Sequence, residues 1–523
     1  MMLSKALGRI AAGAAMAAAL IGSAAAGPVT LRSYDGAVAI SGDLVEFTGD
    51  VFVLRTTIGD LRINAMQVAC EGEGCPDPSL LRSEFAMAGS DEIGATLMPA
   101  LLLAYADSLD ADLLQSREGD SLIARIRSAA GADLATVTIR EGESEDAFKA
   151  LLAGDAAIGM SARPVSDAEL AALRAAGAPD ITDPAHERII ALDGLVVVVA
   201  PSNPIDALSQ EDIADIFAGE ITNWSELGGP DAPIVIYAPE GESSARAMFE
   251  ENILQPLGLS IGDGAKLFQN DGDLADQVAL DPNGIGFVSI ASVRAAKPVA
   301  IRTECGLIAT PDPFGIKTEE YPLARRLYLY TKDETLPPHA KQLLAFAQSS
   351  QAQPVIADAG YVDQGIESRT INEQGMRFAM AFTDPSPEFR YGQMRELATE
   401  LLGAERLSAT FRFNPGSSQL DNKAQLDVKR VIEYLSQPTI GEKEVLLIGF
   451  TDSVGRADLN RALSFRRADQ VRAAIEAAAP AGALDKIDFR VMGYGELAPV
   501  GCNESLAGRR INRRVELWIR DKF

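Results

Sequence analysis

The feature of this sequence that most restricts its fold is a strand that is apolar along its whole length. Residues 194–204 read GLVVVVAPSNP, in which an unbroken apolar run stops at Pro201. A strand without polar alternation must be covered on both faces, which is typical of largely parallel sheets that carry helices on each side. Helical and strand-like segments alternate in this way over residues 84–365, and this length favours two α/β lobes over one.

The start of the chain predicts a secretory signal peptide. Lys5 and Arg9 precede an Ala-rich apolar run at residues 10–21, and small residues follow up to Ala26. This run is too short to span a bilayer, and no later stretch approaches the roughly 20 apolar residues of a membrane helix. We therefore expect a signal peptide at residues 1–26, an exported chain and no transmembrane segment.

The composition excludes several classes of partner and activity. The formal net charge is −27, and loss of Lys5 and Arg9 with the signal peptide would change it to −29. Nucleic acid and anionic lipid are poor partners for so acidic a chain. The glycine motifs of nucleotide-binding proteins and the Gly-x-Ser-x-Gly motif of hydrolases are absent from the sequence. The sequence therefore predicts neither an enzyme nor a cofactor.

Four cysteines and two histidines limit the covalent and metal chemistry. Cys70 and Cys75 enclose a Glu-Gly-Glu-Gly turn, which predicts a local disulfide in an oxidising compartment. Cys305 and Cys502 are about two hundred residues apart, and the sequence leaves their pairing open. Because only two histidines accompany these thiols, no metal site is expected.

The chain as a whole reads as a multidomain α/β protein. Short alternating strands at residues 27–80 predict a small β module. The two α/β lobes at residues 84–365 are followed by a connector at 366–405. A last α/β sandwich is expected at 406–523, where strand-like segments such as EVLLIGF and RRVELWIR are separated by two long helical segments.

One of these helical segments turns an arginine inward. At about 100° per residue, Arg467 lies within roughly 40° of the apolar residues of its helix, such as Leu463 and Val471. Asn460 falls on the same stripe, and Asp452 lies in the loop after the strand EVLLIGF. A buried guanidinium needs partners. The spacing alone leaves two possibilities open, an internal Asp452–Arg467 ion pair or a bound ligand.

Three segments in this part of the chain resemble the OmpA-like C-terminal domain, which binds peptidoglycan without covalent attachment. They read TFRFNPGSSQLD, GFTDSVGRADLNRALSFRRADQV and GYGELAPVGCNESLAGRRINRRVEL, in family order. The resemblance implies that Asp452 and Arg467, with Thr451 and Asn460 beside them, grip the diaminopimelate residue of the peptidoglycan stem peptide. A carboxylate suits the ligand ammonium, and a guanidinium suits its carboxylate.

Two features near this expected site need a separate interpretation. Phe450 stands where the family usually has histidine, and we expect it to pack under the loop. Arg513 and Arg514 are expected to form structural ion pairs rather than to bind the ligand.

The middle of the chain resembles the phosphate-type periplasmic substrate-binding proteins of ABC importers. The segments that carry this resemblance include AGSDEIGATLMPALL, LLAGDAAIGMSARP, LSQEDIADIFAGEITNWSELGG and DPNGIGFVSIASVRAAKPVAI. The resemblance implies two lobes that close on a small oxyanion such as phosphate. It also implies an importer permease as a further partner, whose existence the sequence leaves open. The positions that match the family's anion site are Ser90, Asp91, Ser144, Ser161, Arg163, Ser243 and Ser244.

The family's anion motif is altered in this chain. Pro239 stands in place of the family's arginine, and Ser243, Ser244 and Ala245 occupy its Ser-Gly-Thr positions. Loss of that arginine removes a charge-assisted contact worth on the order of 2–4 kcal/mol when buried. Arg163 or Arg246 could substitute for it. Phosphate, another small ligand and an inactive cleft kept as structure all stay open.

Together these features predict a periplasmic solute-binding protein that is tethered non-covalently to peptidoglycan. It would lie on the outer-membrane side of a Gram-negative envelope. The alternative is an envelope-tethering protein whose cleft is inactive or binds another small ligand.

Overall fold

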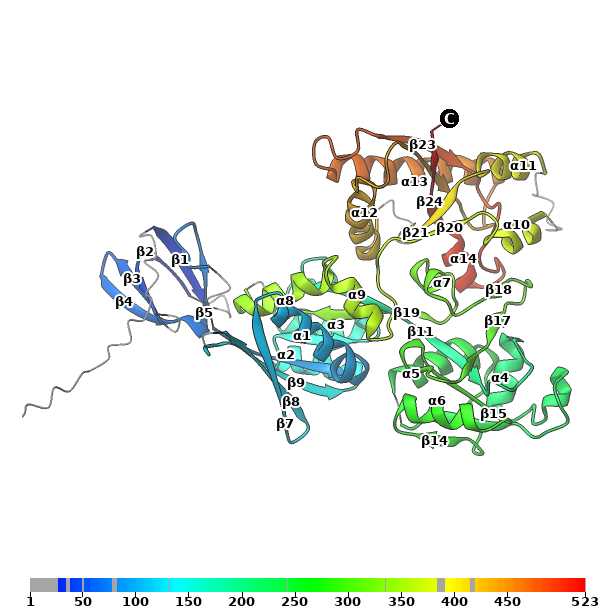
Figure 1. The fold of residues 1–523 in the computed structure, drawn as a ribbon, viewed down its shortest axis with the longest axis horizontal. Coiled ribbons are helices and arrows are strands. Elements are labelled where there is room, and N and C mark those ends of the chain that lie inside the picture. The colour runs from blue at the N-terminus through cyan, green and yellow to red at the C-terminus, as the bar shows by residue number, and fades with distance from the viewer. Residues whose placement is uncertain are drawn as a thin grey trace, which may run out of the picture. The chain divides into compact units, whose positions relative to one another are not determined.

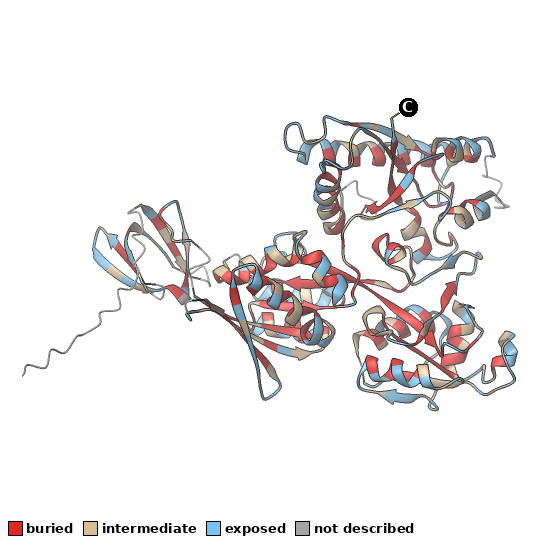
Figure 2. Ribbon diagram, viewed as in Figure 1, coloured by how far each residue is buried: buried red, intermediate tan, exposed pale blue. Residues whose placement is uncertain are grey.

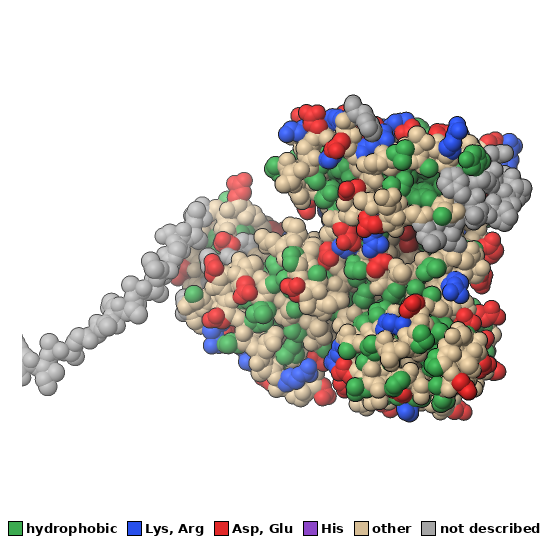
Figure 3. Space-filling model, turned by 45° about the vertical axis from the view of Figure 1, so that its right-hand side comes forward, with side chains coloured by type: hydrophobic (Ala, Val, Ile, Leu, Met, Phe, Trp, Pro, Cys, Tyr) green, Lys and Arg blue, Asp and Glu red, His purple; other side chains and the backbone are tan. Residues whose placement is uncertain are grey.

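The structure is a computed structural model that describes residues 27–33, 38–48, 51–77, 82–129, 131–241, 243–333, 335–382, 391–413 and 419–522. The signal peptide expected at residues 1–26 lies outside this part of the chain. The chain forms two compact units, Met1–Ser83 with Thr335–His339, and Glu84–Glu334 with Ala340–Phe523. Acidic side chains are spread over the face drawn in Figure 3, as the net charge of −27 leads one to expect.

The first unit contains the predicted small β module. Its five strands pair antiparallel in the order β4-β3-β2-β1-β5 (Figure 1). Leu44, Phe52 and Leu54 form the centre of its core and are fully buried. The predicted disulfide between Cys70 and Cys75 is confirmed. The strands are β1 (Pro28–Ser33), β2 (Ala39–Phe47), β3 (Val51–Thr56), β4 (Gly59–Asn64) and β5 (Val68–Glu71).

Two long strands, β11 (Glu187–Val199) and β19 (Ala324–Tyr330), join the predicted lobes. They pair antiparallel at the middle of a large sheet of order β14-β13-β15-β11-β19-β10-β6-β9-β8-β7. Residues 194–199 of the apolar run predicted as a strand form the second half of β11 and are buried (Figure 2). We call residues 84–193, 325–333 and 340–365 lobe 1, and residues 194–324 lobe 2.

The sheet differs from the expected, largely parallel one. Strand pairs β10–β6, β13–β14 and β13–β15 are parallel, but β11 pairs antiparallel with both β19 and β15. Helices cover both faces here as they would in a parallel sheet, so the apolar run indicated burial on two faces but not strand direction.

Helices pack around this sheet in each lobe (Figure 1). Lobe 1 contains β6 (Ser83–Ser90), α1 (Met98–Asp107), β7 (Ala111–Glu118), β8 (Ser121–Ser128), β9 (Asp133–Gly142), α2 (Ser144–Ala153), β10 (Ile158–Ser161), α3 (Asp167–Ala175), α8 (Pro338–Gln348) and α9 (Ala352–Asp358). Lobe 2 contains β12 (Ala207–Ser209), α4 (Gln210–Ala218), β13 (Val235–Pro239), α5 (Ser244–Phe249), β14 (Lys266–Phe268), α6 (Asp271–Leu280), β15 (Gly284–Ser289), β16 (Lys297–Pro298), β17 (Ala300–Arg302), β18 (Ile308–Ala309) and α7 (Pro313–Lys317).

The C-terminal domain is a sheet of order β20-β21-β24-β22-β23 with helices on both faces. Helices α12 and α13 share one apolar cluster with the sheet, and α10 and α11 share the cluster on its other face. The elements are β20 (Ser368–Thr370), α10 (Gly375–Phe382), α11 (Tyr391–Glu400), β21 (Glu405–Arg412), α12 (Asn422–Leu435), β22 (Lys443–Gly449), α13 (Ala457–Ala478), β23 (Ile487–Gly493), α14 (Leu506–Asn512) and β24 (Arg514–Asp521).

Residues 366–405, which we expected to form a connector, contribute part of this domain. They supply the edge strand β20 and the two helices α10 and α11. Phe378, Met394 and Leu397 are buried in the same cluster as Trp518 of β24. The domain therefore begins about 40 residues before the predicted boundary, because these helices bury the second face of its sheet.

Candidate functional site

Arg467 lies on the buried face of α13, as its helical position predicts. Its exposed fraction is 7%, and Asn460, Ser464 and Val471 are buried on the same face. The guanidinium lies over the ring of Phe413, with 5.2 Å between Cζ and the ring centroid. Nη1 is buried, and no described residue provides it with a hydrogen-bond partner. Burial lowers the pKa of Arg467 and the charge of Arg513 lowers it further, while Asp452 partly offsets both effects.

Asp452 is held in the loop that follows β22 and does not form the internal ion pair with Arg467. Its Oδ2 accepts a hydrogen bond from Arg513 Nη1 at 2.7 Å, and its Oδ1 accepts one from the Val454 amide at 3.1 Å. Arg513 is thus in an ion pair, as expected, but this pair is part of the candidate site. Among the described ion pairs, none involves Arg467.

Asn460 and Thr451 complete the four residues that the sequence assigns to this site. Asn460 Nδ2 donates to the carbonyl oxygens of Asp452 at 3.3 Å and Val454 at 3.2 Å, which fixes the acidic loop on α13. Thr451 Oγ1 is buried and, like Arg467 Nη1, has no described partner. The structure therefore leaves one donor and one hydroxyl of the predicted set unsatisfied.

Glycines allow α13 to approach the sheet at this site. A Cβ atom at Gly449 would lie 1.9 Å from the Ser464 carbonyl oxygen, and one at Gly493 would lie 2.4 Å from the Phe465 amide nitrogen. Any larger residue would push the helix, and with it Arg467, away from the loop.

Two of the five predicted serines of the second site, Ser144 and Ser244, line the cleft between the lobes, and protein atoms already engage the hydroxyls of all five. Ser144 and Ser244 hydrogen-bond to each other at 2.8 Å across the two lobes. Ser90 Oγ donates to Glu92 at 2.7 Å, and Ser161 Oγ donates to the Arg163 carbonyl at 2.7 Å. Ser243 instead accepts from the Arg246 amide at 3.2 Å and caps α5.

Both arginines that could replace the family's arginine are engaged elsewhere. Arg163 forms a fork with Glu169, with distances of 2.7 and 2.8 Å. Arg246 pairs with Glu250 at 2.8 Å and donates to the Pro239 carbonyl at 3.3 Å.

A third arginine, which the sequence analysis missed, lies where the lobes join. Arg325 of β19 donates from Nε to Asp193 at 2.8 Å and from Nη2 to Glu92 at 2.9 Å. Its only signal in the sequence is a pair of arginines at the start of the otherwise apolar strand ARRLYLY.

A cavity of about 820 Å³ lies between the lobes. Ser144 lines it from lobe 1, Ser244 lines it from lobe 2, and Arg325 lines it from the strand between them. Arg412 and Arg510 of the C-terminal domain also contribute to its wall. The cavity is therefore built from three parts of the chain.

Three carboxyl groups in or near this cleft have raised pKa values, and one of them, Glu143, lines the cavity. Partial desolvation and the charge of Glu92 raise the pKa of Asp91, which stays open to solvent, to about 6. Desolvation and the charges of Asp91 and Glu92 raise the pKa of Glu143 to about 7. Burial raises the pKa of Asp271 to about 6. Near neutral pH Glu143 is thus partly protonated, whereas Asp91 and Asp271 are largely ionised.

Two regions of the chain match models of known protein families. The model of the PBP superfamily domain matches residues 122–351, and that of the OmpA family matches residues 412–513. The chain combines a PBP superfamily domain with an OmpA family domain. We call the two lobes the PBP domain and the C-terminal domain the OmpA domain.

Curated relatives match one domain or the other. The phosphate-binding protein PstS of Borreliella burgdorferi is 22% identical over 188 residues, covering 35% of this chain and 67% of the relative. Protein SphX of Synechococcus elongatus is 29% identical over 209 residues, covering 38% and 60%. Outer membrane porin F of Pseudomonas fluorescens is 34% identical over 116 residues, covering 22% and 33%. The chain thus spans from about one third to two thirds of the length of these relatives.

Solved structures resemble the PBP domain. An ABC-type phosphate transport receptor from Vibrio cholerae covers 53% of this chain and 99% of its own, with 23% identity and a TM-score of 0.41. PstS from Borrelia burgdorferi covers 54% and 98%, with 19% identity and a TM-score of 0.37.

Among the described residues, no helix is long and apolar enough to cross a membrane.

The PBP and OmpA domains are joined covalently. Cys305, in the turn between β17 and β18, forms a disulfide with Cys502 of the OmpA domain. This settles the pairing that the sequence left open. Because both sulfurs are in this bond, neither is available as a thiolate ligand.

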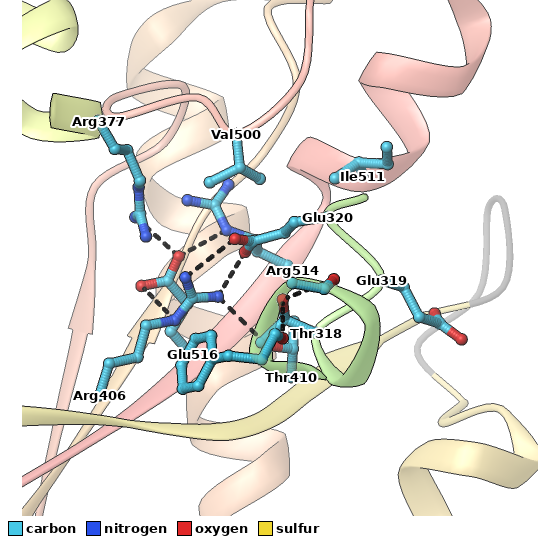
Figure 4. A network of polar contacts seen from close by, with 12 residues as sticks. Thr318, Glu319, Glu320, Arg377, Arg406, Thr410, Val500, Ile511, Arg514 and Glu516 are labelled. Carbon is cyan, nitrogen blue, oxygen red and sulfur yellow. Dashed lines mark hydrogen bonds and ion pairs between the residues drawn. The ribbon is translucent and has the colours of Figure 1, made fainter. Parts of the chain in front are cut away.

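A buried ionic cluster joins the same two domains (Figure 4). Arg406 of β21 contacts Glu320 of the PBP domain, and its Nε lies 3.5 Å from Glu516 of β24. Arg377 and Arg514 donate to the same Glu516 at 2.8 and 2.6 Å. Burial alone would raise the pKa of Glu516, but the three guanidiniums hold it well below its usual value. Arg514 thus has the structural ion pair that we expected.

Proposed function

We propose that this protein is a periplasmic solute receptor for phosphate or a related small oxyanion, held to peptidoglycan by its OmpA domain. Its partners would be the diaminopimelate stem peptide, the oxyanion and an importer permease. The place of action would be the cell-wall side of a Gram-negative outer membrane.

The observation that carries the wall-binding part is the unsatisfied Arg467. Its Nη1 is buried without a described partner, and Asp452, whose charge acts on Arg467, is paired with Arg513. A buried guanidinium without a counter-charge is costly unless a ligand completes its pairing. A diaminopimelate residue supplies a carboxylate for Arg467 and an ammonium for Asp452, whose carboxylate oxygens can each accept a further hydrogen bond.

Cosedimentation with purified peptidoglycan tests this part. We expect Asp452→Ala and Arg467→Ala to abolish pelleting of the full chain, because each removes one half of the zwitterion grip. Arg472→Ala is the matched control, since Arg472 lies on the exposed side of the same helix and pairs with Asp469 and Glu476. Retained pelleting of both site variants would refute the grip.

The solute-binding part rests on the family of the lobes and on the cavity between them. Serine hydroxyls from both lobes line this cavity, and hydroxyl donors suit a small oxyanion. Calorimetric titration of the full chain with inorganic phosphate tests it. A receptor should bind with micromolar or tighter affinity.

Specific observations favour a second candidate, an envelope tether with an inactive or retuned cleft. Pro239 replaces the arginine, and both nearby arginines are already paired with glutamates. Peptidoglycan binding without any heat of phosphate binding would select this candidate.

A further inference from the structure

The cleft lacks the arginine expected for its anion, and the structure points to another one. We propose that Arg325, at the crossing of the two lobes, is the arginine that receives the oxyanion, through its Nη1 atom. This inference rests on the proposed function, namely that the cleft binds an oxyanion.

The guanidinium of Arg325 is fixed on two of its three nitrogens. Nε and Nη2 both contact Asp193, at 2.8 and 2.7 Å, and Nη2 also contacts Glu92 at 2.9 Å. The exposed fraction of the side chain is 5%, so it has little freedom to turn. Only Nη1 remains to bind another group.

Nη1 of Arg325 is buried and has no described hydrogen-bond partner. Buried donors are nearly always satisfied in native proteins, by protein, ligand or ordered water. Among the described residues that line the 820 Å³ cavity, Arg325 alone has such an unsatisfied atom. This singles it out from the other cationic side chains around the cavity.

The guanidinium groups of the other arginines in the cavity wall are paired with carboxylates, bonded to carbonyl oxygens or exposed to solvent. Arg163 and Arg246 pair with glutamates, and Arg326 pairs with Glu319 and Asp421. Arg412 donates to the carbonyl oxygens of residues 318, 319 and 511, and Arg510 is exposed.

The partners of Arg325 connect it to both lobes. In lobe 1, Glu92 accepts from Ser90, and in lobe 2, Ser289 donates to Asp193 at 2.7 Å. An oxyanion on Nη1 would therefore join a hydrogen-bonded chain that runs from one lobe to the other. Because Glu92 and Asp193 together carry one more negative charge than the guanidinium neutralises, Nη1 acts as a hydrogen-bond donor rather than as a net positive charge. The ligand class that fits is a small oxyanion of low charge.

Calorimetric titration of the full chain with inorganic phosphate and with sulfate at pH 7 tests the inference. Arg325→Lys keeps the positive charge but removes Nη1, so we expect Kd to rise about 10- to 100-fold, the loss of a charge-assisted hydrogen bond. Arg174→Lys is the control in lobe 1, because Arg174 pairs with Asp180 and is not among the described residues that line the cavity. We expect its Kd to stay within about twofold of wild type. Circular dichroism checks that each variant is folded.

Glu92→Gln provides a second test if Arg325→Lys does not fold. Removal of this carboxylate frees the guanidinium from a competing negative charge, so the Kd for phosphate should fall several-fold. A purely structural role of Arg325 would give equal or weaker binding, and that result would overturn the inference.

The outcomes separate this inference from the proposed function. Wild-type binding that survives Arg325→Lys, or that is lost equally in Arg174→Lys, contradicts the inference alone. If wild type binds neither anion, the oxyanion receptor and the role of Arg325 both fail.

Discussion

At the scale of single residues, Arg467 and Arg325 share a buried nitrogen without a described partner but differ in their counter-charges. The charge of Arg325 is outweighed by the two carboxylates of Glu92 and Asp193, whereas Arg467 has the ring of Phe413 and no ion pair among the described residues. The two sites should therefore respond differently to charge. Arg467 needs a ligand that brings a full negative charge, and Arg325 needs only an acceptor.

A carboxylate at the cleft gives a pH-dependent prediction. The pKa of Glu143 is raised from its usual value near 4.5 to about 7 by desolvation and by the charges of Asp91 and Glu92. Such a carboxyl costs no stability below pH 4.5, where it is protonated both folded and unfolded, and costs most above pH 7. We expect Glu143→Gln to raise Tm by about 1–2 °C at pH 8, since solvent screening discounts the effect. Thermal melts at pH 4 should show no gain, and an equal gain at both pH values would contradict the shift.

Residue-level prediction from sequence succeeded where local periodicity decided the outcome. Arg467 was placed inward because helical spacing fixes its direction, and Phe450 is buried as expected, with Arg514 stacked 4.2 Å from its ring centroid. The Asp452–Arg513 pair joins positions 61 residues apart, so it depends on how β24 returns beside β22. Arg325 was missed because its buried surroundings come from strands and loops that are distant in sequence.

At the scale of elements, α10 and α11 change the boundary of the OmpA domain. The sequence predicts a connector in their region because the stretch FTDPSPEFRYG interrupts its apolar pattern. The apolar residues of α10 and α11 are buried because they pack on the second face of the sheet, and their local sequence does not show this contact. The apolar pattern likewise could not predict the strand direction of β11. Such a pattern indicates burial on both faces and does not indicate parallel or antiparallel pairing.

Truncation of one buried side chain of α11 measures how much this packing contributes to stability. Leu397 is fully buried against the sheet, so Leu397→Ala should lower the free energy of unfolding by about 2–5 kcal/mol. Leu402, which is 62% exposed just after the helix, is the matched control and should change it by less than about 0.5 kcal/mol on truncation to alanine. Urea unfolding distinguishes the two. Equal effects would show that the region behaves as a connector after all.

At the scale of the whole molecule, the Cys305–Cys502 bond and the cluster around Glu516 make the PBP and OmpA domains one structure. Sequence indicated both domains but not their union, because a disulfide across 197 residues depends on how two domains meet. The wall-binding domain would thus carry the receptor without a flexible link between them.

Removal of the Cys305–Cys502 disulfide should weaken the connection between the PBP and OmpA domains. The double variant Cys305→Ser/Cys502→Ser should lose about 3–5 kcal/mol of stability, since the bond closes a long loop in the unfolded chain. Calorimetry should then resolve separate transitions for the two domains. The control Cys70→Ser/Cys75→Ser, which opens a short loop of the β module, should leave these transitions in place. A single unchanged transition in the first variant would mean that the bond contributes little.

The zwitterion grip of the OmpA domain is tested most directly by calorimetric titration of the full chain with two soluble muropeptides. One carries diaminopimelate at the third position of the stem and the other carries lysine, which has the same ammonium but lacks the carboxylate that Arg467 would bind. If Arg467 binds the carboxylate, the diaminopimelate peptide should bind at least about tenfold more tightly than the lysine peptide. This difference should be lost in Arg467→Ala. Equal affinity for both peptides in the wild-type chain would contradict it.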